Sequence, residues 1–528
     1  MGIYLNPGNT DFQKALNSEI YVDKTELIKY TNKVINTEQE YICVSRPRRF
    51  GKSMAANMLT AYYSRGCDSR EMFRKYKIAK TDTFEKHINK YNVIHINMVK
   101  YLDEAKNIKE MIKFIEEDII DEITEEFPDA KLPRRVTLIN VLDKVFAQLK
   151  ISFVFIIDEW DCIFRRHKED SESQTIYLNF LRDLLKNKSY VALAYMTGIL
   201  PIKKYGEHSA INVFYEYSMT DANPISEFTG FTESEVKSLC EQYDKPFEQM
   251  KRWYDGYCLD GISIYNPKSV VESILRDNFG NYWTKTETYE ALKVYIQTNF
   301  DGLRDKIVKL IAGEKVNINT DKFQNDMTTF NSADDVLTLL VHLGYLTYND
   351  NMAWIPNSEV AQEFINSIED GGWEELMRSI KSSDKLLSAT LDCNEGKVAE
   401  LIEQAHQDNT SILKYNDENS LSCVLSLAYY SARKNYTVER ELPAGKGFAD
   451  LVFKPRTNCH SPALIVELKY DSTAESAIDQ IKNKQYVDCL KDYSGEILLV
   501  GINYDKESKK HSCKIDKICT ATVQLRQQ

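Results

Sequence analysis

The chain has 528 residues, a formal net charge of −12 and 43% hydrophobic residues. This length suits two to four domains, and the hydrophobic content is ample for buried cores. The negative net charge excludes a uniformly basic surface, so any contact with DNA or RNA must use a local basic face.

The spacing of cysteine and histidine residues and the hydropathy exclude several other classes. Eleven cysteines include no C-x-x-C pair, and their odd number argues against a disulfide framework. The eight histidines show no H-x-x-x-H pairing, which leaves a zinc hydrolase without support. We find no signal peptide and no apolar run as long as a membrane span, so we expect a cytoplasmic protein without a membrane partner.

The first chemical motif, S-R-P-R-R-F-G-K-S, runs from Ser45 to Ser53. It follows the apolar segment 41–44 and precedes the helix-compatible run 54–59, which predicts a strand, a loop and a helix. A loop ending in Gly-Lys-Ser at a helix N-terminus offers backbone N–H groups and the positive end of the helix dipole to phosphate. The motif therefore predicts a phosphate-binding loop.

Two side chains of this loop have expected roles in binding ATP. Lys52 would contact the β- and γ-phosphates, and Ser53 would ligate Mg²⁺. The match to G-x-x-x-x-G-K-[ST] is incomplete, because Arg46 stands where the first glycine belongs. The pattern alone therefore leaves a chance match as the alternative.

A second motif follows a strand-like segment. The apolar run Phe153–Ile157 predicts a strand buried on both faces of a parallel sheet, and it ends in Asp158 and Glu159. Carboxylates at such a strand end face the ligand crevice of an α/β sheet. We expect Asp158 to hold Mg²⁺ opposite Ser53 and Glu159 to polarise the attacking water. The alternative is a surface pair of acids at a strand end.

The next strand and the connecting regions complete the first half. Tyr190–Met196 fits the same sheet and ends at Thr197, whose hydroxyl either senses the γ-phosphate or belongs to a turn. Thr232–Glu235 is a capping box that predicts the start of a lid helix. Residues 333–357 predict a helix and two short strands, a winged-helix-like element that either touches nucleic acid or joins domains. The charged, helix-prone sequence around 375–412 is the expected hinge.

The C-terminal region carries a third group of charged residues on two predicted strands, Gly447–Phe453 and Ala463–Lys469. Glu467 and Lys469 are two residues apart, so they project from one strand face. If Asp450 faces the same way on the adjacent strand, two carboxylates and one ammonium group converge. Such a trio can bind one or two Mg²⁺ ions, activate water and balance charge on a phosphodiester. An exposed salt-bridged hairpin is the alternative.

Several segments, read in order, resemble the bacterial AAA-ATPase-like family: 21–25 (Y-V-D-K-T), 46–53, 157–159, 197–199, 253–257 (W-Y-D-G-Y) and 265–267. An arginine-rich loop replaces the first glycine in that family, so the resemblance implies nucleotide binding despite Arg46. Arg46, Arg48 and Arg49 would be three cations beside the polyphosphate, on a turn stiffened by Pro47. The implied nucleotide-binding set is Arg46, Arg48, Arg49, Phe50, Gly51, Lys52, Ser53, Asp158 and Thr197.

Members of this family usually carry a C-terminal domain of the PD-(D/E)XK nuclease superfamily. This resemblance implies that Asp450, Glu467 and Lys469 are catalytic. It also implies that Glu418, at the start of an amphipathic helix, joins Asp450 and Glu467 as a ligand of Mg²⁺ or Mn²⁺. Members of the superfamily can keep the fold after losing cleavage, although all the positions are filled here.

The sequence therefore predicts an α/β protein in four parts. They are a P-loop NTPase parallel-sheet domain at 1–222, a helical lid at 223–300, a helical and winged-helix-like connector at 301–385, and a PD-(D/E)XK nuclease-like α/β domain at 386–528.

The expected function is ATP binding and hydrolysis that controls a metal-dependent nuclease acting on DNA or RNA. One alternative is a non-enzymatic, ATP-dependent binding switch with a cleavage-dead nuclease fold, and a weaker one is an ATPase acting on proteins. A homo-oligomer is a further expectation, in which Arg165 or Arg166 could serve a neighbouring subunit as an arginine finger. No residue indicates the specificity or the pathway.

Overall fold

The computed structural model describes residues 2–131, 133–202, 211–283, 289–297, 300, 302–321, 323, 330–369, 372–409, 418–444, 447–456, 459, 461–490 and 493–519. Its contacts divide the chain into two compact units. The first unit comprises Met1–Tyr295 and Asn317–Glu363, and the second comprises Ile296–Val316 and Phe364–Gln528. Each unit is described by itself.

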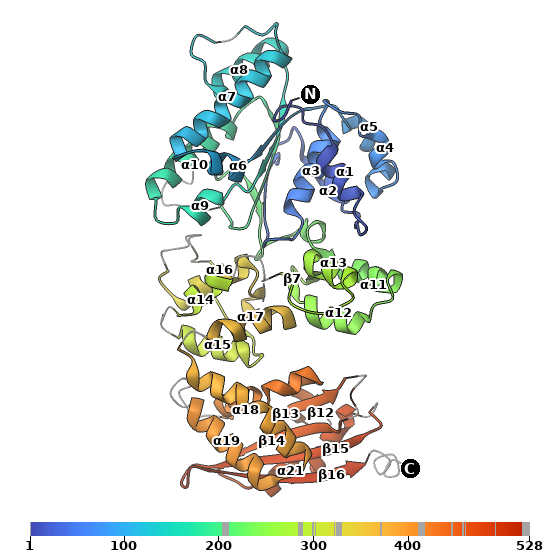
Figure 1. Cartoon of the computed structure of the whole chain (residues 1–528), viewed down its shortest axis with the longest axis vertical. Helices are drawn as coiled ribbons and strands as arrows, with labels where there is room; N and C mark the ends of the chain where they lie inside the picture. Colours follow the sequence, from blue (N-terminus) through green and yellow to red (C-terminus); the bar gives the residue numbers. More distant parts are fainter. Residues whose placement is uncertain are drawn as a thin grey trace. The chain divides into compact units, whose positions relative to one another are not determined.

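The first unit is built around a five-stranded parallel sheet with the strand order β2-β3-β4-β1-β5 (Figure 1). The strands are β1 (Tyr41–Ser45), β2 (Asn92–Asn97), β3 (Phe153–Asp158), β4 (Val191–Gly198) and β5 (Tyr215–Tyr217). The central strands β1, β3 and β4 are buried along their whole length, as expected for apolar runs covered on both faces. The three strands predicted for this sheet are thus confirmed.

Helices cover both faces of this sheet, with α1 to α5 on one side and α6 to α10 on the other (Figure 1). Their bounds are α1 (Thr10–Leu16), α2 (Glu26–Val34), α3 (Lys52–Tyr63), α4 (Arg70–Phe73), α5 (Phe84–His87), α6 (Met98–Glu104), α7 (Ile108–Glu126), α8 (Leu138–Leu149), α9 (Cys162–Arg166) and α10 (Ser171–Leu185). The result is a three-layer α/β arrangement.

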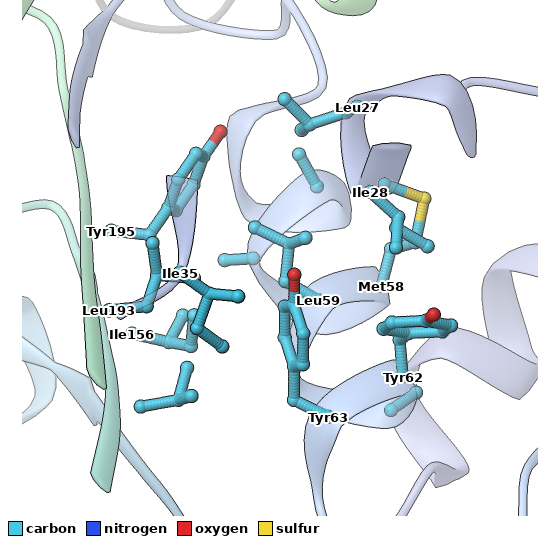
Figure 2. Close-up of a cluster of buried hydrophobic side chains, with 14 of the residues drawn as sticks. Leu27, Ile28, Ile35, Met58, Leu59, Tyr62, Tyr63, Ile156, Leu193 and Tyr195 are labelled. Carbon is cyan, nitrogen blue, oxygen red and sulfur yellow. The ribbon is translucent and has the colours of Figure 1, made fainter. Parts of the chain in front are cut away.

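The helix that follows the predicted phosphate loop is fixed by the core. Leu59 and Tyr63 of α3 lie among buried side chains of α2 and of the sheet, including Ile28, Ile156 and Leu193 (Figure 2). Removing such large apolar surfaces from water is the main stabilising contribution to a core of this kind. This packing sets the direction of α3, and therefore the place of its N-terminus beside the sheet edge.

The segment after the parallel sheet contains helices and also a small antiparallel sheet with the order β6-β8-β7. Its elements are β6 (Phe231–Thr232), α11 (Glu233–Gln242), α12 (Phe247–Tyr254), β7 (Tyr257–Leu259), β8 (Ile262–Tyr265) and α13 (Pro267–Leu275). The capping box predicted at Thr232–Glu235 is present at the start of α11. The expected lid is therefore mixed rather than purely helical, because a hairpin joins α12 to α13.

The predicted winged-helix-like element forms as a helix and a hairpin. α16 (Ala333–Leu343) ends at Gly344, which has φ 90°, and the hairpin of β10 (Thr347–Asn349) and β11 (Met352–Trp354) follows. A left-handed residue is a common way to end a helix, and glycine adopts it without a Cβ penalty. The elements before and after this segment in the sequence are α14 (Tyr289–Gln297), α15 (Leu303–Ile311), β9 (Val316–Asn317) and α17 (Ser358–Glu369).

The second unit contains a five-stranded mixed sheet with the order β12-β13-β14-β15-β16. Its elements are α18 (Glu374–Leu391), α19 (Glu395–Asn409), α20 (Glu418–Ala428), β12 (Tyr436–Ala444), β13 (Gly447–Pro455), β14 (Ala463–Tyr470), α21 (Ala474–Asn483), β15 (Glu496–Asp505) and β16 (Lys510–Cys519). Only β14 and β15 are parallel, and α21 lies between them in the chain. The predicted boundary at 385/386 falls within α18, which packs against α19 and α20.

Across the described ranges, no helix is long and apolar enough to cross a membrane. The cysteines described are free thiols.

One buried pair in the second unit couples its stability to pH. The His406 Nδ1 atom lies 3.2 Å from Nε2 of His511, and the Tyr504 ring packs against both imidazoles. Burial, followed by the neighbouring His406, lowers the pKa of His511 to about 3. Burial also lowers the pKa of His406, although Glu403 opposes that shift. Because the unfolded chain binds protons more readily, this cluster stabilises the fold above pH 6.5 and loses that contribution as the pH falls toward 3.

We expect the urea midpoint of the second unit to fall between pH 7 and pH 4.5, and to fall less in His511→Gln. The substitution removes an imidazole that must stay neutral in the fold. Tyr504→Phe keeps the ring and removes no group that titrates in this range, so it is the matched control. An equally steep fall in His511→Gln and in the wild type would contradict the assignment.

Candidate functional site

The loop between β1 and α3 is a phosphate-loop turn with left-handed residues at two positions. Gly51 has φ 87° and is the N-cap of α3, and Arg49 has φ 68°. The first N–H groups of a helix have no partner within the helix, so this N-terminus is suited to bind an anion. The predicted strand, loop and helix are confirmed.

Arg46 is an interior anchor of this loop. Its Nη1 donates to the carbonyl oxygens of Ser45, Tyr217 and Ser218, and its Nε donates to the hydroxyl of Thr229, all at 2.8 to 3.0 Å. The side chain is fully buried, and this burial lowers its pKa to about 10. The expectation that the Arg46 guanidinium faces phosphate is therefore corrected, because its donors point into the protein.

Lys52, the first residue of α3, is held inside the loop. Its Nζ donates to the carbonyl oxygens of Arg46 and Pro47, each at 2.9 Å. Burial lowers the pKa of Lys52, while the nearby Glu159 and other acids oppose that shift. The ammonium group therefore lies inside the loop, where its two acceptors are neutral carbonyl oxygens that phosphate oxygens would replace.

Asp158 and Thr197 meet at the carboxyl ends of β3 and β4. Asp158 is 3% exposed, and its Oδ1 accepts a hydrogen bond from the Thr197 hydroxyl. Thr197 lies within β4, so the turn alternative does not hold. Neighbouring parallel strands bring these side chains together at one sheet edge, as the sequence predicted.

Glu159 leaves the strand in the left-handed region, with φ 58°, and its carboxylate forms an ion pair with Arg165. Arg165 also contacts Asp161, with Nε and Oδ2 3.1 Å apart. Arg166 of the same helix pairs with Asp103. These ion pairs within the chain were not predicted from the sequence, where the two arginines were considered as an arginine finger for a neighbouring subunit.

A cavity of about 450 Å³ opens beside the loop. It is lined by Arg48, Arg49, Gly51, Lys52, Ser53, Met54, Val99, Glu159, Arg165 and Arg166. Cations dominate this lining, and one carboxylate faces them. The lining therefore suits a polyphosphate, and it includes both Ser53 and Glu159.

A second, apolar cavity of about 360 Å³ also adjoins the loop. It shares Arg49, Gly51 and Met54 with the first cavity. Its remaining lining is Ser18, Ile20, Tyr21, Val22, Lys24, Phe50, Ala55, Met58, Phe228, Gly230, Phe231, Pro267, Lys268 and Val271. Apolar walls next to a phosphate site are suited to a nucleobase.

The 21–25 segment lines the apolar cavity and forms local hydrogen bonds before α2. Tyr21 and Val22 line the apolar cavity. Asp23 accepts hydrogen bonds from the backbone N–H and the hydroxyl of Thr25, and its other oxygen accepts one from the N–H of Lys77. Asp23 therefore ties the chain before α2 to residue 77 and does not cap α2, whose N-cap Thr25 makes no side-chain cap hydrogen bond.

Several segments distant in sequence contact the phosphate loop. The Gly230 N–H donates to the carbonyl oxygen of Phe50 at 3.0 Å, and the Trp283 Nε1–H donates to that of Arg48 at 3.1 Å. Gly344 approaches the proline of the loop so closely that a Cβ at residue 344 would lie 2.8 Å from the proline ring. The lid and the winged-helix-like element therefore contact the loop directly, which the sequence did not predict.

The second unit brings three predicted residues together, Asp450 near the start of β13 and Glu467 and Lys469 near the end of β14. The antiparallel register pairs Leu451 with Val466. The adjacent positions on the two facing strands are Asp450 and Glu467. The Nζ of Lys469 lies 3.3 Å from Glu467 Oε1, and Asp450 accepts a hydrogen bond from the backbone N–H of residue 468 at 2.7 Å. The salt-bridged pair is largely buried, which argues against the exposed-hairpin alternative.

Glu467 has features that fit a cation ligand. Burial, followed by the charge of Asp450, raises its pKa to about 8. Its Oε2 is buried and makes no hydrogen bond to any part of the chain that the structure describes. A bound Mg²⁺ or Mn²⁺ would compensate the charge of the two neighbouring carboxylates, and it would give the unpaired buried oxygen a partner.

A helix residue orients this glutamate. Gln480 of α21 donates through Nε2 to Glu467 Oε1, and the same nitrogen lies 3.1 Å from the hydroxyl of Tyr486. The contact of Gln480 with Glu467 depends on how α21 packs over the sheet, and Tyr486 follows α21 in a short 3-10 helix, Tyr486–Leu490.

The third predicted metal ligand is not described. Glu418 is the first residue of α20, and its side chain lies outside the described part of the structure. Within the described ranges, no group of three or more histidine, cysteine, aspartate or glutamate side chains is arranged to hold a metal. The carboxylates described at this site are therefore the pair Asp450 and Glu467.

Comparison with known proteins finds one curated relative and one solved structure of interest. A protein of Azotobacter chroococcum mcd 1, described as an uncharacterized protein in the vnfD 5′ region, is 23% identical over 280 residues, which is 51% of this chain and 51% of that protein. The match thus spans about half the length of that relative. A solved structure, the Walker-type ATPase of Pyrococcus abyssi, has a TM-score of 0.33 and 15% identity, covering 65% of this chain and 94% of that one.

Two family models match different parts of the chain. Residues 7–206 match the family described as predicted AAA-ATPase, and residues 416–513 match the PD-(D/E)XK nuclease superfamily. These ranges contain the phosphate loop and the carboxylate pair, respectively. The N-terminal part of the chain is therefore similar to the predicted AAA-ATPase family, and its C-terminal part is similar to the PD-(D/E)XK nuclease superfamily.

Proposed function

We propose that this protein acts in the cytoplasm, binds and hydrolyses ATP, and uses its nucleotide state to control a metal-dependent nuclease domain that acts on DNA or RNA. The observation that carries the proposal is that each unit gathers the groups its reaction needs. In the first unit, Lys52, Ser53 and Glu159 line one cation-rich cavity.

The second unit gathers a carboxylate pair and an ammonium group. Asp450 and Glu467 lie on facing strands, and the Nζ of Lys469 lies 3.3 Å from the Glu467 carboxylate. This is the donor set that a metal-dependent attack on a phosphodiester requires.

The first reaction is supported by groups that surround the predicted phosphate position. Lys52 would exchange its two loop carbonyls for β- and γ-phosphate oxygens, which are stronger acceptors because they are charged. Bound Mg²⁺ would neutralise charge on the phosphates, and Ser53 and Asp158 are the residues that would hold it. Thr197 fixes the orientation of Asp158, and Glu159 would accept a proton from the attacking water.

The second reaction is supported by the burial and orientation of the carboxylate pair. Asp450 and Glu467 would hold Mg²⁺ or Mn²⁺, which activates water and stabilises the charge that develops on a phosphodiester. Gln480 keeps the Glu467 carboxylate oriented, so that Oε2 is left for the cation. Lys469 supplies a positive charge beside the same carboxylate, which would balance the phosphate during in-line attack.

The proposed control by nucleotide begins at the phosphate loop. A bound triphosphate would draw Lys52 away from the carbonyls of Arg46 and Pro47. That change would disturb the loop backbone that Trp283 and Gly344 contact. Packed interfaces have discrete arrangements, so a small shift at the loop would move the lid and the winged-helix-like element together.

We expect Lys52→Ala to weaken ATP binding by about tenfold or more, because a charge-assisted contact contributes about 1.5–3 kcal/mol. Isothermal titration with Mg²⁺-ATP measures the affinity, and circular dichroism checks that the protein stays folded. Lys33→Ala, at an exposed position of α2, is the matched control. Normal ATP affinity in Lys52→Ala would contradict the phosphate-loop assignment.

We expect purified protein with Mg²⁺ or Mn²⁺ to cleave a DNA or RNA substrate, and Asp450→Asn to lower the rate by about 100-fold or more, because the metal contributes several kcal/mol. Mixed single- and double-stranded DNA and RNA serve as substrates. Glu439→Gln removes a carboxylate that pairs with Lys454 on the same sheet, so it is the matched control.

The same assay separates the proposal from its alternative. Cleavage that Asp450→Asn abolishes, and that changes with ATP in the wild type but not in Lys52→Ala, supports a nucleotide-controlled nuclease. Absence of cleavage under every condition, with nucleic acid still bound, would instead favour an ATP-dependent binding switch with a cleavage-dead fold.

A further inference from the structure

Arg165 lies in the wall of the phosphate cavity and is held there by two acids. Its side chain is 10% exposed, its Nη2 pairs with Glu159 Oε2, and its Nε lies 3.1 Å from Asp161 Oδ2. Burial alone lowers the pKa of this guanidinium, but Asp161 and Glu159 more than compensate, so its pKa is raised. The group is therefore a fixed cation beside the residue proposed as the base.

Asp161 fixes the position of this cation against the sheet. The carboxylate is fully buried, and its Oδ2 also accepts hydrogen bonds from the backbone N–H groups of Ile199 and Leu200, at 2.9 and 2.8 Å. These residues directly follow β4, which carries Thr197. Arg165 is thus tied to the same strand end as the group that orients Asp158.

The guanidinium lines the cavity and has donors that the described chain does not use. Nε and Nη2 make the contacts with Asp161 and Glu159, whereas Nη1 makes no hydrogen bond to any residue within the described ranges. The planar fork of arginine can hold two acceptors at once. Arg166 differs, because it is more exposed and pairs with Asp103 on α6.

We propose that Arg165 contacts the terminal phosphate of ATP in cis and links it to Glu159, with Asp161 as the residue that positions the guanidinium. This inference rests on the proposed ATPase function and adds a residue to it. In the hydrolysis step, the water oxygen bonds to the γ-phosphorus while its proton passes to Glu159. The bond to the β–γ bridging oxygen breaks, and its electron pair leaves with ADP. Arg165 stabilises the charge on the γ-phosphoryl group as this occurs.

The test is made on the full-length protein with Mg²⁺-ATP and Mg²⁺-ADP. We expect Arg165→Ala to weaken ATP binding by about tenfold or more while ADP affinity changes less than about threefold, because only ATP carries the contacted phosphate. The kcat is expected to fall by about 100-fold or more. Arg182→Ala, on the surface of α10, is the matched control.

Two further variants separate contact from structural support. Arg165→Lys keeps the charge but not the fork, so we expect it to recover part of the preference for ATP over ADP and little of kcat. Asp161→Asn keeps an acceptor for the backbone N–H groups but loses the charge that holds Arg165. It should therefore lower kcat more than it changes KM.

Binding of ATP by the wild type distinguishes failure of this inference from failure of the proposed function. If the wild type binds no ATP, the proposed function itself fails. If the wild type binds and hydrolyses ATP but Arg165→Ala loses ATP and ADP affinity equally, or keeps its kcat, the inference is overturned. Should Arg165→Ala not fold, Arg165→Lys decides, since an unchanged kcat in that variant would equally overturn the inference.

Discussion

The first unit depends on one constraint, which is that parallel strands deliver their carboxyl ends to a single sheet edge. β1 ends at the phosphate loop, β3 at Asp158 and β4 beyond Thr197. Because α3 is fixed by its buried face against the sheet, Lys52 at its first turn cannot move far from those strand ends. Core packing therefore sets the position of the charged groups, and none of them needs a long flexible loop to reach the site.

Charge burial at this edge is balanced by local partners. Lys52 donates hydrogen bonds to two carbonyl oxygens of the loop, and Arg46 donates to carbonyl oxygens in the interior. Arg165 forms ion pairs with two acidic side chains. A buried charge without partners would be costly, so each cation has acceptors before any ligand arrives. These cations differ in whether a phosphate could replace their acceptors. Neutral carbonyls are weaker acceptors for Lys52 than phosphate oxygens, whereas Arg46 has no open side toward the cavity.

Local patterns in the sequence predicted the central strands β1, β3 and β4, the hairpin of β10 and β11, the strands β13 and β14, and the charged or polar residues near the strand ends. Asp158, Thr197 and the carboxylate pair of the second unit follow or interrupt buried apolar runs, so strand period and strand direction were enough to group them. Arg46 was placed wrongly, because its partners in β5 and at residue 229 lie more than 170 residues away. The same holds for Trp283 and Gly344 at the loop, since no local pattern reports a contact made only by tertiary packing.

The two sites use the same physical arrangement with opposite charges. At the phosphate loop, a buried ammonium group is held by weak acceptors that an anion can displace. At the end of β14, a buried carboxyl is oriented by Gln480 through one oxygen, and its second oxygen has no partner among the described residues. In each case the protein fixes the geometry of the charged group and leaves part of its bonding capacity to a ligand of opposite charge. Ligand binding then completes interactions that the fold has already oriented, which lowers the cost of ordering the site when the ligand binds.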